Sequence, residues 1–205
     1  MRKFILSLVA ATSLLLCADV VAENLVSTSV FSRHVWRGQG GPASVSIQPT
    51  VNVASTGTAI GTTAVQLWAQ IPIIRGETEY DFIVSQDLGE NASLAITSYY
   101  YDGPLLDGDN HDIEVGVSTS FAGVDAFVGR FVSGDEVKDD TYVELGYDLD
   151  GRTVFVGGGD GGYSEGGGFS LVNVGVSVER GEGYGASFIY NPDTETPYLV
   201  VRKSW

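Results

Sequence analysis

The residues in this sequence best suited to chemistry are its two histidines. His34 and His111 could serve a lipid hydrolase or acyltransferase, which would need a serine within hydrogen-bond reach of one of them. Serine is common throughout the chain, so its presence does not select this chemistry. We therefore expect that the protein is not an enzyme, and a lipid-modifying enzyme is the least favoured alternative.

Two short motifs resemble ligand sites but lack the structural context of those sites. Gly157, Gly159 and Gly162 have the spacing of a dinucleotide fingerprint, yet no helix is expected after them to bind a phosphate. The acidic segment 107–112 offers oxygen ligands for Ca²⁺, but it lacks the spacing of a helix-loop-helix calcium site. The sequence predicts loops at both places, with no cofactor and no metal site.

Apolar and polar residues alternate along most of the chain, which is the pattern of β-strands with one apolar face. Ile113, Val115 and Val117, for example, are interleaved with polar or small residues. This pattern predicts an all-β fold of about twelve strands, with ten as the alternative. The expected strands are residues 25–37, 43–54, 62–72, 77–87, 92–102, 111–121, 124–132, 141–150, 152–158, 169–180, 184–190 and 197–205.

The connections between these strands alternate in length. Short turns are expected at 55–58, 89–91, 122–123, 150–151 and 181–183, and longer loops at 103–110, 133–140, 159–168 and 191–196. Unequal rims are typical of an antiparallel, up-and-down transmembrane β-barrel. Aromatic residues would then form girdles at both rims. The long-loop girdle would contain Trp36, Tyr80, Tyr100, Phe169, Tyr190 and Tyr198, and the short-turn girdle Phe121, Tyr184 and Trp205.

The two ends of the chain indicate export to the outer membrane. Arg2 and Lys3 precede an apolar run over 4–16, which predicts a cleaved signal peptide at 1–22 and a barrel domain at 23–205. At the other end, three residues share one face and resemble the signal that the barrel-insertion machinery reads: Leu199, Val201 and Trp205. We expect a protein of the cell outer membrane, in contact with lipid and lipopolysaccharide.

The chain is acidic, with 11 Lys and Arg against 26 Asp and Glu and a net charge of −15. This balance disfavours nucleic acid as a partner. Charges that by parity face the lumen could oppose each other across an open, cation-preferring channel, or could pair directly and fill the interior. The lumen candidates are Arg33, Arg37, Glu79, Asp81, Asp112, Glu114, Glu144 and Arg202.

Segment 32–39, Ser-Arg-His-Val-Trp-Arg-Gly-Gln, resembles the first-strand motif of the proteobacterial porin-like family called TorF or Gcw-chp. Trp36-Arg37-Gly38 carries the likeness, although His34 replaces the usual tyrosine. Four further segments resemble the family in order: 68–69, 79–81, 99–101 and 142–145.

The resemblance implies an outer-membrane barrel with a channel role, and no defined solute. We therefore expect a diffusion channel for small solutes, with a cation preference suggested by the acidic lumen. A closed structural or adhesive barrel remains the main alternative. The sequence does not indicate an oligomeric state.

Overall fold

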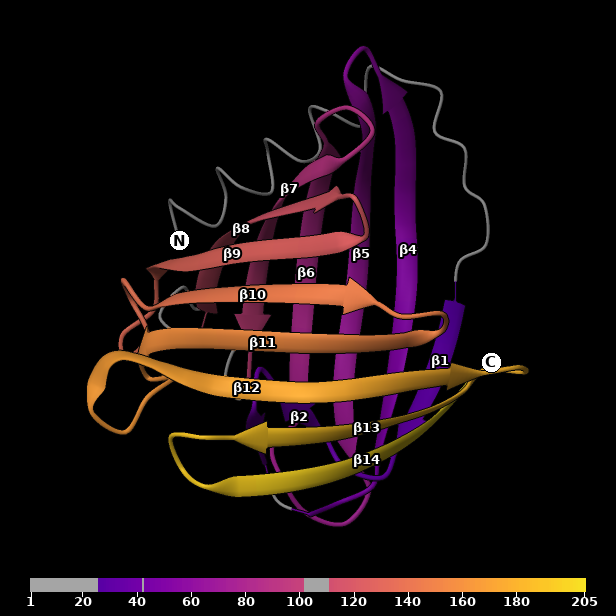
Figure 1. Ribbon diagram of the computed structural model, residues 1–205. Coiled ribbons are helices and arrows are strands. Elements are labelled where there is room, and N and C mark those ends of the chain that lie inside the picture. Colours follow the sequence, from indigo (N-terminus) through magenta and orange to yellow (C-terminus); the bar gives the residue numbers. More distant parts are fainter. Residues whose placement is uncertain (1–25, 42, 102–110) are drawn as a thin grey trace.

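The structure is a computed structural model that describes residues 26–41, 43–101 and 111–205. These residues form a closed, antiparallel barrel of twelve strands and one separate two-stranded hairpin (Figure 1). The barrel strands are β1 (Val26–Phe31), β4 (Ser46–Thr58), β5 (Gly61–Pro72), β6 (Glu79–Asp87), β7 (Ala92–Tyr100), β8 (His111–Phe121), β9 (Val124–Ser133), β10 (Thr141–Asp148), β11 (Arg152–Gly161), β12 (Gly167–Arg180), β13 (Tyr184–Asn191) and β14 (Thr196–Ser204). The hairpin consists of β2 (Val35–Trp36) and β3 (Gln39–Gly40).

The predicted all-β, up-and-down fold is confirmed, because each barrel strand pairs with its neighbours in antiparallel register and the last strand closes on the first. Closure includes the C-terminal residue: the amide of Trp205 donates to the carbonyl of Thr28 over 3.0 Å. Three predicted features lie outside the described residues: the signal peptide at 1–22, the longer loop at 103–110 and the 107–110 part of the acidic segment.

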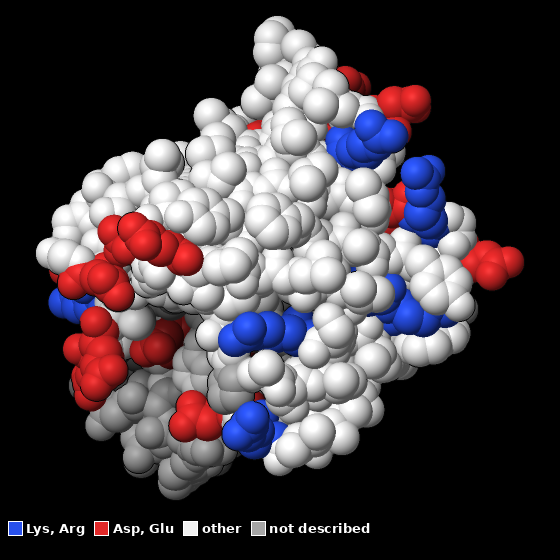
Figure 2. Space-filling view, turned by 60° about the horizontal axis from the view of Figure 1, so that its bottom comes forward, with Lys and Arg blue, Asp and Glu red and all other residues white. Residues whose placement is uncertain are grey.

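The outer face of the barrel is apolar. Large side chains on this face are exposed because none of the described residues covers them, for example Val117, Val128, Leu145, Phe188 and Leu199. Figure 2 shows one broad face that is free of charged side chains and bordered by mainly acidic groups at its left edge. Among the described residues, no helix is long and apolar enough to cross a membrane.

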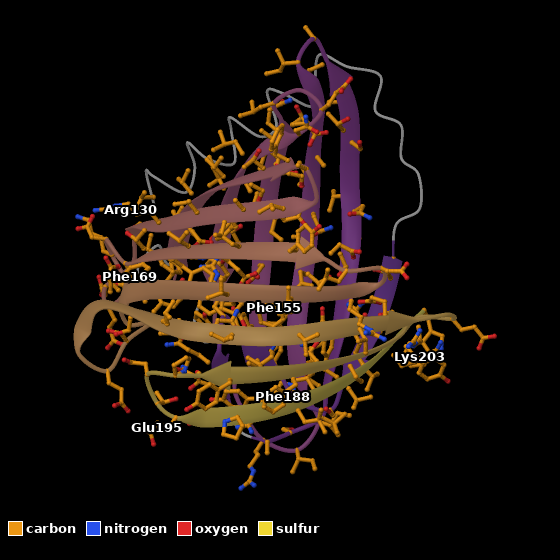
Figure 3. All side chains as sticks on the ribbon, in the orientation of Figure 1. Arg130, Phe155, Phe169, Phe188, Glu195 and Lys203 are labelled. Atoms are coloured by element: carbon orange, nitrogen blue, oxygen red, sulfur yellow. The ribbon has the colours of Figure 1, made fainter. Side chains whose placement is uncertain are left out.

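The two rims differ as expected. Figure 3 places Arg130, Phe169 and Glu195 at the rim with the longer connections, and Lys203 at the opposite rim. The short-turn rim contains three turns built on an X-Gly dipeptide with two positive φ angles: Ala122-Gly123, Asp150-Gly151 and Glu182-Gly183. Such pairs of left-handed residues match the twist of a tight hairpin. The turn expected at 55–58 is wrong, since β4 continues to Thr58.

The first predicted strand, 25–37, is also wrong in its extent. β1 leaves the barrel wall after Phe31, and β4 takes the wall position beside it from Ser46 onward. The chain between them forms the β2–β3 hairpin. Side chains of six barrel strands and of the β11–β12 loop contact this hairpin, so it lies inside the barrel near the long-loop end.

The buried core of the protein is the interior of the barrel at this end. It contains Tyr99, Phe131, Tyr142, Tyr163 and Val172, with Trp36 of the hairpin packed against them. Two expected members of the aromatic girdle are therefore placed wrongly. Trp36 points into the barrel because it belongs to the hairpin inside the lumen. Tyr198 also points inward, because it is buried and lies on the same face of β14 as buried Val200. Tyr80, Phe169 and Tyr190 are exposed on the outer face, as are Phe121, Tyr184 and Trp205.

Candidate functional site in the barrel lumen

The β2–β3 hairpin turns through Arg37 and Gly38, which have φ angles of 50° and 78°. This is the same X-Gly geometry as in the short-turn rim, placed inside the lumen. The left-handed conformation costs an arginine about 1–2 kcal/mol. Interactions of the Arg37 side chain must offset that cost.

Backbone contacts fix the position of the hairpin. Asn191, a buried residue of β13, donates its amide N–H to the carbonyl of Gly38 over 3.1 Å. A Cβ atom at Gly38 would collide with the carbonyl oxygen of Val172 on β12. The amide of Gly40 donates to the hydroxyl of Tyr198 on β14 over 3.3 Å. These contacts leave no room for a side chain at Gly38.

A two-fold hydrogen-bonded ion pair joins Arg37 to Glu114 on β8. The Nη1 and Nη2 atoms of Arg37 lie 2.5 and 2.9 Å from Oε1 and Oε2 of Glu114. Only 11% of the arginine side chain and 4% of the glutamate side chain are exposed. Burial by itself lowers the pKa of Arg37, but the hydrogen bond to Glu114 and nearby negative charge raise it above its ordinary value. The guanidinium is therefore charged at neutral pH, and in this structure it is paired with Glu114.

Aromatic rings surround the guanidinium of Arg37. Its central carbon lies over four ring centroids, at 4.4 Å from Trp36, 4.8 Å from Phe127, 4.7 Å from Tyr142 and 5.8 Å from Tyr163. Arg37 also donates to the hydroxyl of Tyr163. Cations held over ring faces gain about 2 kcal/mol when they are desolvated. We call the wall residues Glu114, Tyr99, Phe127, Tyr142 and Tyr163 the arginine cage.

Tyr99 on β7 completes the cage by donating its hydroxyl to Oε2 of Glu114 over 2.9 Å. Its ring also packs at 5.7 Å from Trp36. Glu114 thus accepts hydrogen bonds from the hairpin and from the wall. Both oxygens of this buried carboxylate have partners, which is the condition for a stable buried charge.

A second carboxylate lies beside the cage on β10. Glu144 accepts hydrogen bonds from the hydroxyl of Tyr142 over 2.5 Å and from the amide of Asn173 over 2.7 Å. Asn173 also donates to the hydroxyl of Tyr142 over 2.9 Å. Gly157 on β11 makes room for this cluster, since a Cβ atom there would meet the Tyr142 hydroxyl.

Two more predicted carboxylates, Glu79 and Asp81, lie on β6 on the lumen side. Asp81 is buried, and its Oδ1 atom has no hydrogen-bond partner among the described residues. Glu79 lies 3.8 Å from Nε2 of His34. Burial lowers the pKa of His34 to about 4, so the imidazole is neutral at pH 7.

The remaining predicted lumen charges do not meet in the cage. Arg33 donates to the carbonyl of Gly41 and stacks on Tyr198, and Asp112 lies half-buried on β8 two residues before Glu114. Arg202 pairs with Glu179 near the short-turn rim. Arg202 pairs across the wall with Phe31 and Gly185, so it lies near the short-turn rim and away from Arg37.

The short-turn half of the lumen carries small polar side chains and the ring of Phe155, which faces inward against Gly175. Ser118 of β8 pairs across with Ser93 and Phe127, so that it faces inward like Glu114, and it is exposed to solvent. Inward-facing Asp125 and Asp148 are also exposed. Solvent therefore reaches the barrel interior from this end.

The predicted insertion residues, Leu199, Val201 and Trp205, face outward on β14. Their exposed fractions are 69%, 49% and 69%. Lys203 lies on the same face and places its ammonium over the rings of Tyr184 and Trp205. The outward apolar face is as expected. Recognition of these three residues by the barrel-insertion machinery stays a prediction.

Sequence reasoning missed Tyr99, Tyr142, Tyr163 and Asn173 as site residues. Tyr142 has the same parity as Glu144, a predicted lumen residue, so the alternation along this strand already implied that Tyr142 faces inward. The glycines that face the rings carried another signal. Gly116 and Gly129 lie against Phe127, and Gly159 lies against Tyr163. Inward glycines on neighbouring strands therefore mark where large lumen side chains fit.

No protein-family model, no curated protein and no solved structure matches this chain. The likeness to the TorF or Gcw-chp family stays a prediction from the sequence.

Proposed function

We propose that the protein is an outer-membrane channel for small solutes that is closed in the described state by the β2–β3 hairpin. The observation that carries the proposal is the way the hairpin is held. A charged pair between Arg37 and Glu114 seats it inside a lumen whose other half admits solvent. The apolar outer face, the unequal rims and the closed wall support the membrane location.

The charge of the lumen supports a preference for cations. Glu79, Asp81, Glu114 and Glu144 all face the interior near the hairpin, whereas Arg37 is the only arginine hydrogen-bonded to one of them in the described part of the chain. An acidic interior raises the local concentration of cations and excludes anions. Opening of the hairpin would remove Arg37 and increase this acidic excess.

The test is conductance of the purified protein in a planar bilayer. The wild type should show rare openings, and a variant in which residues 34–41 are replaced by a Gly-Ser linker should conduct steadily. Under a KCl gradient, the reversal potential of the linker variant should lie closer to the equilibrium potential of K⁺ than to that of Cl⁻. A Gly-Ser exchange of the 181–183 turn is the matched control and should behave as the wild type.

Silence of both proteins would contradict the channel and support the closed structural or adhesive barrel. The filled core at the long-loop end is the observation that favours this second role. An adhesive barrel would act through its outer loops, and exchange of the hairpin would not change surface binding.

A specific contact also favours the lipid-modifying alternative. The Oγ atom of Ser98 lies 2.9 Å from Nδ1 of His111, and Ser98 shares the outward parity of Ile96. This is the serine–histidine proximity that a hydrolase requires. Against it, His111 is 5% exposed and stacks on Tyr100. Hydrolysis of a chromogenic ester by the wild type but not by Ser98→Ala would establish the enzyme; equal background rates would exclude it.

A further inference from the structure

The arginine cage has the composition of a ligand site rather than of ordinary core. We propose that it is a guanidinium-binding site, that Arg37 occupies it as a tethered ligand, and that guanidinium-bearing solutes are the cations that compete with the hairpin. The binding site stands on its own geometry, and its role in solute selection rests on the proposed channel.

The cage fits the shape of a guanidinium. Glu114 presents both oxygens to two nitrogens of one planar fork, at 2.5 and 2.9 Å. An ammonium cannot make such a parallel pair of hydrogen bonds, whereas any guanidinium can. The ring faces of Phe127 and Tyr142 add attraction for a flat, weakly hydrated cation.

The site belongs to the barrel wall and not to the hairpin. Tyr99, Glu114, Phe127 and Tyr142 lie on the consecutive strands β7, β8, β9 and β10. Tyr163 follows β11 and is held in the core by Tyr142, whose ring centroid is 5.2 Å away. Trp36 is the only ring over Arg37 that the hairpin itself supplies, among the ring contacts of the described residues. The cage would therefore persist when Arg37 leaves it.

The electrostatic environment requires a cation in the cage. When Arg37 is removed, Glu114 stays buried, and the Tyr99 hydroxyl is its remaining hydrogen-bond donor. Asp81 lies on β6 at the same end of the lumen, and its buried Oδ1 atom has no hydrogen-bond partner among the described residues. Loss of one member of a buried ion pair is costly because the other charge stays uncompensated. A free cation of the right shape would relieve that cost.

The inner face below the cage is polar at the short-turn end. Ser118 and Asp125 face the lumen and are exposed. Between Ser118 and Glu114, the ring of Phe127 packs against buried Gly116. A small solute that enters from this end would therefore meet Asp125 and would have to displace the Phe127 ring before it reaches Glu114.

The test is chemical rescue of Arg37→Ala in detergent. Thermal unfolding is followed by tryptophan fluorescence with millimolar guanidinium or methylguanidinium, against ammonium, urea and KCl at matched ionic strength. We expect both guanidinium compounds to raise the melting temperature of the variant by about 3 °C or more relative to KCl. The wild type should not respond, because Arg37 fills the site. Arg37→Gln replaces the alanine variant if that one does not fold, and should show the same ranking of compounds.

Two controls make the result specific. Arg202→Ala also removes an arginine paired with a glutamate, but at the exposed rim, and should show no guanidinium response. Arg37→Ala combined with Glu114→Gln should lose the response. Equal effects of guanidinium and KCl, or equal effects on Arg37→Ala and Arg202→Ala, would overturn the site. The rescue experiment does not require a conducting protein. If guanidinium rescues Arg37→Ala but the protein never conducts, the channel proposal is refuted and the binding site is not.

Discussion

The two halves of the lumen each contain an arginine–glutamate pair, and the pairs differ in every respect that determines their strength. Arg37–Glu114 lies in the long-loop half, buried, doubly hydrogen-bonded and surrounded by rings. Arg202–Glu179 lies near the short-turn rim, where 36% and 58% of the two side chains are exposed. The same residue types therefore serve as a fixed plug in one half and as a solvated surface pair in the other.

The comparison teaches that the interior is divided by packing and not by charge alone. Aromatic side chains packed against glycines fill the long-loop half: Tyr142 is paired across the wall with Gly159, and its hydroxyl lies against Gly157. Serine and exposed aspartate line the short-turn half, and solvent enters it. Under the proposed channel function, the barrier of the closed state is the packed layer around the hairpin.

The largest expected difference is between the two arginines. Arg37→Ala should lower the free energy of unfolding by about 3–5 kcal/mol, because Glu114 is left buried without its main partner. Arg202→Ala should cost about 0–1 kcal/mol, since its pair is exposed and screened. Denaturant unfolding of both variants in the same detergent measures the difference, and equal losses would mean that the hairpin pair is not buried.

A smaller effect separates the lumen wall from the outer face in the wet half. Val117→Arg should cost about 2–4 kcal/mol near the bilayer midplane, because the charge would face lipid. Ser118→Arg places the same side chain one residue further, inside the solvated lumen, and should cost little. Unfolding in lipid vesicles measures both. Similar costs at 117 and 118 would contradict either the membrane location or the wet short-turn half.

The smallest expected effect compares a glycine from each half. Gly157→Ala should cost about 1–3 kcal/mol, because the new methyl group meets the Tyr142 hydroxyl that Asn173 and Glu144 hold in place. Gly146→Ala on β10 should be nearly neutral, since the nearest atom, Cγ2 of Thr153, is 3.6 Å away. Thermal unfolding of the pair distinguishes tight from loose packing. A neutral Gly157→Ala would show that the long-loop half has spare volume.

Most of the wall could be predicted from the sequence, because a strand with an apolar outer face and a polar inner face must alternate. The strand at 111–121 has the expected bounds, and the closing strand differs by one residue at each end. Parity also placed Glu114 and Glu144 on the inner face. Strand bounds and the face on which a residue lies are local properties, and the two-residue period of the sequence is enough to predict them.

The hairpin could not be predicted from periodicity. Ser27, Ser29, Arg33 and Arg37 keep one parity, so the pattern runs on past the point where β1 ends at Phe31. The available signal was Arg37-Gly38, an X-Gly pair like Ala122-Gly123 that permits a two-residue turn. Whether such a turn folds inward depends on contacts with strands far along the chain, such as Asn191, and no local pattern encodes these.

Closure of the lumen by the Arg37–Glu114 pair is tested most directly by the open probability of single channels in a double-mutant cycle. Wild type, Arg37→Ala, Glu114→Ala and the double variant are recorded in the same planar bilayer. If the pair holds the hairpin, each single variant should open far more often than the wild type, and the double variant should add little to either. Open probabilities that multiply independently, or that stay at the wild-type level in all four proteins, would contradict this closure.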